Sequence, residues 1–493
     1  MNKKYLDYLF KQRKAAYLFF GLLVCAISLS PFISGGEERI YSMQSTMTAA
    51  CVFGIFFTFV LPAVLFAWVH RRRSADLYFA LPVKRKDMLV TTVVFITLLS
   101  WIYFLIPVSI AVVLGRGGLL MWLAASLFTL FFFLVMTLFN SMLFLIANNI
   151  FDGVVMMGAY SMIPVVVYAV SATFLDICVA GMRSMDYPMT LMRWLSPTML
   201  GANTYNTLWH SILAGTPDFH WWYCAALVLY GLLAAWVLKM EFVERQSERA
   251  EQVSDRFFSY PLIINFYAFC IMIVITAGKP TLESFRAHLI WYLILLLIYI
   301  VAMFIYRRKI QVRPKDLGLF LAGILLSLAL SAAAWSTRGF GLADNYRLEE
   351  GDSLVYSYWA TVDMYDLTVR EQTEEFWDHY ADVQVEVLLP VPLDEESRPV
   401  RDLVEGKRRE SIDDFYQYND TYYNGWLNVY NLHNELQTNN WQYSLKTLFT
   451  EEELELLAQY GTVTVYAPSI NEEEGIPLDD FLAAREAYIH DHE

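Results

Sequence analysis

Long apolar runs separated by short polar segments dominate the first two thirds of the chain. A helix needs about 20 residues to cross roughly 30 Å of hydrocarbon. Nine runs approach or exceed this length, at about 15–34, 48–69, 88–114, 119–146, 154–175, 221–238, 261–277, 289–306 and 317–335. The pattern therefore predicts a mainly α, polytopic membrane protein with about nine transmembrane helices.

Residues 2–14 precede the first run and carry charged and apolar side chains at helical spacing. The charged set on one predicted face is Lys3, Asp7, Lys11 and Lys14, and the apolar set on the other is Leu6, Leu9 and Phe10. This separation is typical of an amphipathic helix at the membrane surface. The alternative interpretation is a basic segment that only flanks the first span.

Residues 176–220, between the fifth and sixth runs, have few charges but form no continuous span. Their apolar side chains are Met182, Met185, Met189, Met192, Trp194, Leu195, Met199, Leu200, Trp209 and Leu213. Half-spanning or interfacial helices fit this pattern, because non-helical backbone at membrane depth must be covered by protein. A folded external loop is the alternative.

Lys and Arg residues indicate the orientation. With the N-terminus inside, the cytoplasmic segments are 1–14, 70–87, 147–153, 239–260 and 307–316. These segments hold 20 of the 26 Lys and Arg residues of the first 335 positions. Cytoplasmic loops carry such an excess. We therefore expect a cytoplasmic N-terminus and, after nine crossings, an extracytoplasmic C-terminal region.

The charge balance reverses near residue 335. Residues 1–335 have a net charge of +10, and residues 336–493 have one of −24. Two domains are predicted from this change: a transmembrane domain over 1–335 and an acidic extracytoplasmic domain over 336–493.

The C-terminal region has recurring aromatic side chains and is expected to fold. Alternating apolar positions predict strands at 353–361 and 462–466. Helices are predicted at 371–380 and 450–460, and Thr450 is the expected cap of the second. The region is therefore predicted to be a small α+β domain.

The most distinctive polar segment is 70–87, HRRRSADLYFALPVKRKD. Its six basic residues are Arg71, Arg72, Arg73, Lys84, Arg85 and Lys86. They flank five apolar residues, 77–81, which Pro82 closes. A loop that only has to stay hydrated needs no such centre, so we expect something apolar to cover it. The segment is interpreted as a docking helix for a cytoplasmic partner, and a loop resting on lipid head groups is the alternative.

Two phrases resemble a known family. RRSADLYFALPVKRKDMLVTT resembles the first cytoplasmic loop of type-2 ABC transporter permease subunits, in particular those of Firmicutes. The phrase RQSERAE at 245–251 resembles the segment after the sixth helix in the same group. In such transporters the first loop is a coupling helix that seats on the ATPase, and re-entrant helices occur where this chain has 176–220.

The resemblance implies two sets of functional residues. The ATPase-coupling loop would comprise Arg71, Arg72, Arg73, Asp76, Leu77, Leu81, Pro82, Lys84, Arg85 and Lys86. The second cytoplasmic segment would comprise Glu241, Arg245, Glu248 and Arg249. Glu241 and Arg245 are four apart and Arg245 and Glu248 three apart, which suits a helix that continues into the cytosol.

The sequence offers no catalytic, cofactor or metal motif. It lacks a GxxxxGK[ST] phosphate loop, so ATP is expected to be bound by a partner subunit. The acidic clusters at 394–396 and 472–474 are interpreted as solvated surface, and cation binding is the alternative. Residues 490–493 are interpreted as a frayed terminus in preference to a metal site, and the five cysteines as packing residues. The acidic C-terminal region disfavours nucleic acid as a partner.

Polar residues deep in the apolar runs are Asn140, Ser141 and Asn265. For Asn140 and Ser141, hydrogen bonds to a neighbouring helix are the preferred interpretation, and lining a substrate path is the alternative.

The resemblance thus implies the permease subunit of an ABC transporter that works with cytoplasmic ATPase subunits, and on family grounds alone the expected direction is export. By resemblance, a second permease subunit completes a homo- or heterodimer in the lipid bilayer. The alternative function is ATPase-coupled transmission of force or sensing through the C-terminal domain.

Overall fold

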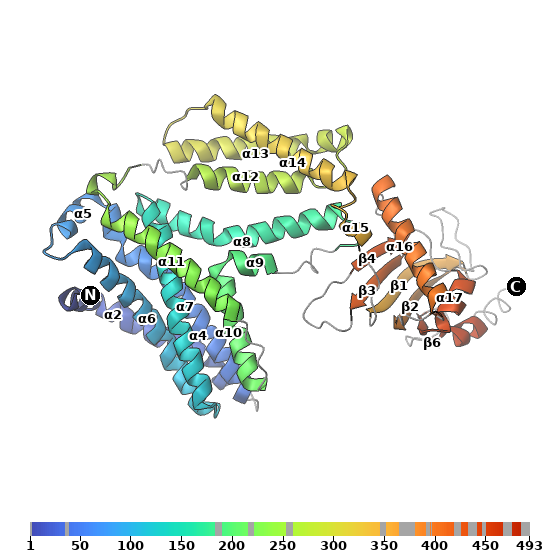
Figure 1. Ribbon diagram of the computed structural model, residues 1–493, viewed down its shortest axis with the longest axis horizontal. Coiled ribbons are helices and arrows are strands. Elements are labelled where there is room, and N and C mark those ends of the chain that lie inside the picture. Colours follow the sequence, from blue (N-terminus) through green and yellow to red (C-terminus); the bar gives the residue numbers. More distant parts are fainter. Residues whose placement is uncertain are drawn as a thin grey trace. The chain divides into compact units, whose positions relative to one another are not determined.

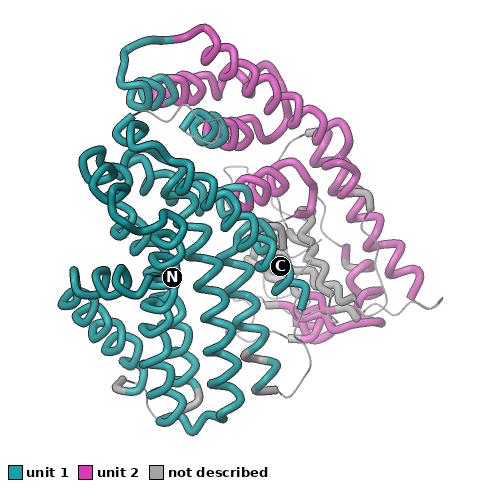
Figure 2. The backbone as a smooth tube through the Cα atoms, turned by 60° about the vertical axis from the view of Figure 1, so that its left-hand side comes forward, with its two compact units in different colours: residues 1–167, 190–267, 299–312 teal, residues 168–189, 268–298, 313–493 magenta. Residues whose placement is uncertain are grey.

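The computed structural model describes residues 2–34, 39–182, 190–214, 221–252, 260–345, 352–363, 380–390, 395, 397–418, 425–431, 441–445, 450–466 and 476–484. This part of the chain is mainly helical, with one sheet near its C-terminal end (Figure 1). Two compact units are present (Figure 2): unit 1 contains 1–167, 190–267 and 299–312, and unit 2 contains 168–189, 268–298 and 313–493. Neither unit ends at residue 335, because α14 (Pro314–Ser336) belongs to the same unit as the sheet.

Unit 1 is a helical bundle. Its helices are α1 (Lys3–Gln12), α2 (Lys14–Ser28), α3 (Ser30–Ser34), α4 (Arg39–Leu65), α5 (Arg72–Phe79), α6 (Arg85–Leu114), α7 (Leu119–Ile146), α9 (Thr190–Leu195), α10 (Pro197–Ala214) and α11 (Trp221–Val243). Helices α4, α6 and α7 pack on one another, and α10 and α11 pack on α7. Three helices contribute to both units: α8 (Ile150–Cys178), α12 (Tyr260–Thr276) and α13 (Leu282–Arg307).

Eight helices of the described residues are long and apolar enough to cross a membrane: Lys14–Phe32, Tyr41–Leu65, Arg85–Leu114, Leu119–Ile146, Ile150–Cys178, Trp221–Val243, Leu282–Arg307 and Pro314–Ser336. The seventh predicted span is α12, a shorter apolar helix of 17 residues. At 1.5 Å per residue it covers about 25 Å, slightly less than the hydrocarbon thickness. The predicted count of nine crossings therefore stays a prediction.

The N-terminal segment forms α1, but its buried face differs from the predicted one. Tyr5 and Leu9 are buried and Leu6 is half-buried, whereas Phe10 is exposed. The backbone N–H of Asn2 donates to Thr91 Oγ1 of α6 at 3.0 Å. The expected apolar face was wrong at Phe10 because α1 packs on α6, which selects the Tyr5–Leu9 stripe.

Residues 190–214 form two helices and not one extended loop. Leu200 and Tyr205 of α10 are buried in a core shared with α4, α6 and α7. Gly201 permits this approach, because a Cβ there would overlap the ring of Phe132. Met185 and Met189, which contributed to the interpretation of 176–220, lie outside the described residues.

In unit 2, α14 packs through a ridge of small side chains on the end of α12. Ser327 and Ser331 are fully buried, and Ser331 Oγ donates to the carbonyl of Gly278 at 2.7 Å. A Cβ on Gly323 would lie 2.9 Å from Met272 Sδ. Small residues at this spacing let helix backbones approach closely in a membrane protein.

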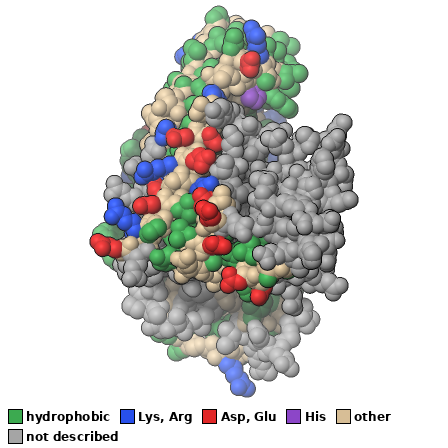
Figure 3. Space-filling view, turned by 90° about the vertical axis from the view of Figure 1, so that its right-hand side faces the viewer, with side chains coloured by type: hydrophobic (Ala, Val, Ile, Leu, Met, Phe, Trp, Pro, Cys, Tyr) green, Lys and Arg blue, Asp and Glu red, His purple; other side chains and the backbone are tan. Residues whose placement is uncertain are grey.

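The C-terminal part of unit 2 has an antiparallel sheet in the order β4-β3-β1-β2-β5-β6. The strands are β1 (Asp352–Asp363), β2 (Tyr380–Pro390), β3 (Gly425–Asn431), β4 (Trp441–Leu445), β5 (Thr462–Tyr466) and β6 (Ile476–Pro477). Helices α15 (Leu342–Asn345), α16 (Arg398–Tyr418) and α17 (Glu451–Ala458) complete it. Figure 3 shows Asp and Glu side chains beside Lys and Arg side chains on one face.

Local predictions in this region have mixed outcomes. The strands at 353–361 and 462–466 are confirmed as β1 and β5. The helix capped by Thr450 is also confirmed, since Thr450 and Glu453 form a reciprocal capping box. The helix expected at 371–380 falls almost wholly outside the described residues, and its last residue, Tyr380, begins β2. Residues 472–474 and 490–493 lie outside the described residues as well.

Candidate partner-docking site

The segment 70–87 contains a short helix, α5, between two tight turns. A 3₁₀ turn, Ala67–His70, precedes α5, and α6 begins at Arg85. The C-cap N–H of Ala80 donates to the carbonyl of Asp76, and Pro82 follows two residues later. Proline disfavours helical geometry in the residue before it, which explains why the helix stops here. The sequence thus places an eight-residue helix, α5, between the two long apolar helices α4 and α6.

The apolar side chains at the centre of this segment divide into two sets, one packed against the protein and one exposed. Tyr78 stacks on Trp68 with ring centroids 4.4 Å apart, and Phe79 lies 6.2 Å from Phe242 of α11. The Tyr78 hydroxyl also lies 2.9 Å from that of Tyr8 in α1. Leu77 and Leu81 remain 67% and 39% exposed. The chain itself therefore covers the two aromatic residues and leaves the two leucines uncovered.

The basic residues divide in the same way. Arg71, Arg72, Arg73, Lys84 and Lys86 are exposed, as are Asp76 and Pro82. Arg85 instead lies with its guanidinium carbon 4.1 Å from the centroid of the Phe79 ring. It donates to the carbonyls of Val243 and Arg245 at 3.2 and 2.8 Å. Arg85, which is half-buried, is thus a positioning residue for α5. We give the name coupling surface to the exposed residues of this segment: Arg71, Arg72, Arg73, Asp76, Leu77, Leu81, Pro82, Lys84 and Lys86.

Arg245 lies beneath the coupling surface and is only 2% exposed. Its Nη1 donates to the carbonyl of Leu145 at 2.6 Å, and its Nη2 donates to the carbonyl of Ala147 at 2.9 Å and to Asn148 Oδ1 at 3.3 Å. Helix α11 continues through Glu241 but ends at Val243, before Arg245 and Glu248. The helical spacing expected for Arg245 with Glu241 and Glu248 was therefore wrong, because the three residues do not share one helix.

The side chain of His70 faces the same guanidinium. Its Nδ1 lies 3.4 Å from Arg245 Nη2, and its ring meets Phe144 edge-on at 4.5 Å. Burial, with a smaller contribution from Arg245, lowers the pKa of His70 to about 3. Burial also lowers the pKa of Arg245 to about 10, with Arg249 adding to the effect. At neutral pH His70 is therefore neutral and Arg245 is charged, held by neutral oxygen acceptors.

These contacts join three segments that the charge pattern assigned to the cytoplasm. Residues 70–87, 147–153 and 239–260 meet at Arg245, and the N–H of Glu251 adds a hydrogen bond to the carbonyl of Asn148 at 2.8 Å. We call Arg245, His70 and the three acceptors the Arg245 anchor. Sequence reasoning missed His70, Trp68 and Phe242, because they lie at the ends of apolar runs and follow no motif.

The remaining predicted residues have separate positions. Glu248 and Arg249 are exposed on the 3₁₀ turn Ser247–Arg249, and Glu241 is half-buried on α11. Asn140 Nδ2 donates to the carbonyl of Thr58 in α4 at 3.2 Å, and its neighbour Ser141 is buried on α7.

Asn265, the third predicted polar residue, belongs to a different helix pair. It accepts a hydrogen bond from Tyr299 of α13 at 2.9 Å, and its own Nδ2 donates to the carbonyl of Pro261. Asn140 and Asn265 thus each connect their helix to a neighbour, and the structure brings neither to the coupling surface.

Comparison with known proteins finds no matching family model, no matching curated protein and no matching solved structure.

Proposed function

We propose that this chain is the membrane-spanning permease subunit of an ATP-driven transporter, and that a separately encoded cytoplasmic ATPase docks on the coupling surface. The observation that carries the proposal is a pair of exposed leucines, Leu77 on α5 and Leu81 two residues after the end of α5, beside Tyr78 and Phe79, which pack on Trp68 and Phe242. Exposed apolar side chains rimmed by charge are typical of a protein-binding site. The resemblance of 72–92 to an ABC permease loop supports the same conclusion.

The attachment of α5 to the neighbouring helices supports a coupling role. A partner can move the membrane helices only if the surface it contacts does not yield. Arg85, the first residue of α6, contacts Phe79 of α5 and donates to carbonyls at the end of α11. Arg245 attaches the end of α11 to the α7–α8 connection. A force applied to α5 by a bound partner would therefore be transmitted to α6, α7 and α11 together.

Contacts between α12 and α8 support nine crossings and an extracytoplasmic C-terminal region. The Tyr260 hydroxyl donates to Asp152 near the start of α8 at 3.2 Å, and the Tyr267 hydroxyl donates to the carbonyl of Ala159 at 2.7 Å. Beyond the end of α12, the N–H of Gly278 meets Cys178 Sγ at 3.4 Å. Successive positions of α12 thus pair with successive positions of α8, itself long enough to cross a membrane.

The proposal is tested by replacing Leu81 with Asp. Burying one leucine contributes roughly 1.5–3 kcal/mol to an interface, and a buried unpaired carboxylate adds a further cost. We expect Leu81→Asp to abolish co-purification of the ATPase with the tagged chain from its native membranes, measured by mass spectrometry and by ATP hydrolysis. A matched control is Leu342→Asp, because Leu342 is also 39% exposed but lies in unit 2. Wild-type recovery of the ATPase with Leu81→Asp would refute the docking role.

Transmission of force through the C-terminal region is a second candidate function. The last turn of α16 is attached to the ends of several helices of unit 2. Tyr416 donates to the carbonyl of Cys178 at 3.0 Å, and its oxygen accepts from the N–H of Ala180. Trp335 stacks on Phe415 at 5.4 Å, and Arg338 pairs with Asp413 at 2.8 Å. Movement of α8 or α14 would therefore pull on α16, which favours this function as the alternative.

A further inference from the structure

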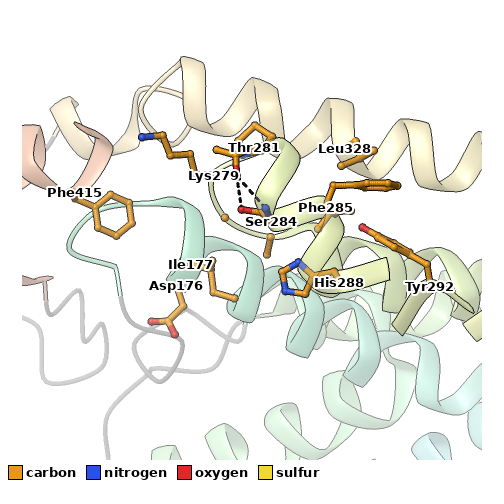
Figure 4. Close-up of a pocket in the computed structure, with 14 residues that line it drawn as sticks. Asp176, Ile177, Lys279, Thr281, Ser284, Phe285, His288, Tyr292, Leu328 and Phe415 are labelled. Carbon is orange, nitrogen blue, oxygen red and sulfur yellow. Dashed lines mark hydrogen bonds between the residues drawn. The ribbon is translucent and has the colours of Figure 1, made fainter. Parts of the chain in front are cut away.

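Unit 2 contains a cavity of about 390 Å³ beside the α16 attachment. Five segments line it: the end of α8, the connection from α12 to α13, α13 itself, α14 and α16 (Figure 4). The side chains that give it chemical character are Asp176, Ile177, Lys279, Thr281, Ser284, Phe285, His288, Tyr292, Leu328 and Phe415. A volume near 400 Å³ is within the usual range for small-ligand sites.

The lining has a polar part that suits an anion. Lys279 Nζ donates to the carbonyl of Gln417 at 2.9 Å, and an ammonium group has two further protons to donate. His288, half-buried on α13, lines the same space. One carboxylate, Asp176, also contributes to the lining and limits its positive charge. A single phosphate group, which accepts several hydrogen bonds, matches this small set of donors.

The other part of the lining is apolar and continues along a membrane helix. Phe285, Leu328 and the buried Tyr292 form its wall, and Figure 4 shows Tyr292 and Leu328 on the side away from Phe415. Further along α13, Leu289 and Leu293 are 46% and 57% exposed. Since α13 is a candidate membrane span, these side chains offer a surface on which an acyl chain can lie.

From this arrangement we infer that the cavity binds the phosphate head group of a membrane lipid, with the acyl chains lying along α13. Lys279 and His288 line the same cavity as the apolar wall, so a phosphate held by either residue has apolar surface in the same cavity, which a free inorganic ion would leave unused. Phe415 of α16 lines the same cavity, so an occupied head-group site contacts the element that holds the C-terminal region. The inference goes beyond the transport function and does not depend on an ATPase.

The test uses the purified full-length chain in detergent micelles with a photoactivatable phosphatidic acid that carries a diazirine in one acyl chain. After illumination, we expect mass spectrometry to find label on the α13 peptide that contains Tyr292. Excess dioleoyl phosphatidic acid should displace the label, whereas dioleoylglycerol and inorganic phosphate should not. Losing one charge-assisted hydrogen bond should lower labelling about tenfold or more, so His288→Glu and Lys279→Glu are the test variants.

The matched control is Arg286→Glu, an exposed basic residue on the same helix that does not line the cavity. Labelling should be unchanged in this variant. His288→Glu is decisive if Lys279→Glu destabilises the chain, because it leaves the Lys279–Gln417 hydrogen bond in place. Displacement by inorganic phosphate or by dioleoylglycerol, an equal loss in Arg286→Glu, or label confined to other helices would each overturn the proposal.

Discussion

The Arg245 anchor in unit 1 and the α16 attachment in unit 2 both fasten a polar segment to membrane helices, but with different chemistry. In the anchor, one buried guanidinium is held by neutral oxygens of residues 145–148, where α7 connects to α8. In the attachment, an ion pair with side chains 47% and 58% exposed acts beside stacked rings and a tyrosine hydroxyl. A buried charge cannot be given up without leaving its partners unsatisfied, whereas exposed contacts can be lost one by one.

The largest expected effect is at the anchor. Replacing Arg245 with Leu leaves the buried carbonyls of Leu145 and Ala147 without this donor. Each buried acceptor left unsatisfied costs roughly 1–3 kcal/mol, so we expect the free energy of unfolding to fall by about 2–6 kcal/mol. The thermal unfolding midpoint of the purified protein measures this. Arg249→Leu is the matched control, since Arg249 is exposed four residues further on and should stay within about 0.5 kcal/mol of wild type. Equal unfolding midpoints for the two variants would contradict the claim that buried Arg245 contributes more to stability than exposed Arg249.

The second effect is a dependence of stability on pH through His70. Its folded pKa of about 3 lies below the ordinary value of 6.5, so the unfolded chain binds a proton that the folded chain does not. Stability contributed by neutral His70 is complete above pH 6.5 and is lost as pH falls toward 3. Between pH 6.5 and 5 the loss approaches about 2 kcal/mol. The thermal unfolding midpoints at pH 6.5 and pH 5 should differ less in His70→Gln than in the wild type. An unchanged difference between the two midpoints would exclude His70 as the cause of the pH dependence.

The smallest effects are expected at the α16 attachment. Tyr416→Phe removes one hydroxyl with two hydrogen bonds and should cost about 1 kcal/mol, while Arg338→Ala breaks an exposed ion pair and should cost less than about 1 kcal/mol. Limited proteolysis of the region after residue 345 reports the attachment directly. We expect faster cleavage in Tyr416→Phe than in Arg338→Ala. The reverse order would show that the ion pair dominates.

These contrasts bear on how force could pass through the protein. If a partner docks on the coupling surface of unit 1, the Arg245 anchor would transmit most of the partner's displacement to the membrane helices. The attachment in unit 2 is built from several weak contacts, so its strength can change stepwise. A head group in the neighbouring cavity, beside Phe415, would be one way to change it.

The sequence by itself determined the elements whose signal is local. The run at 119–146 is α7 residue for residue, since it is continuously apolar, begins directly after Gly117 and Gly118 and ends just before Asn148 and Asn149. Strand β5 and the Thr450 cap were equally predictable, because alternation and capping depend on neighbours within a few residues. The basic and apolar composition of 70–87 likewise singled out the segment that contains α5 and its two exposed leucines.

Only the tertiary structure decided which side chains of that segment are available. Leu77, Tyr78 and Phe79 are consecutive and apolar, and the position of Trp68 and Phe242 determines that the rings turn inward while Leu77 stays exposed. Arg245 looked like a surface residue with helical partners, yet the end of α11 at Val243 turns it into the core. Both outcomes depend on contacts between residues far apart in the chain, and local periodicity contains no information about those.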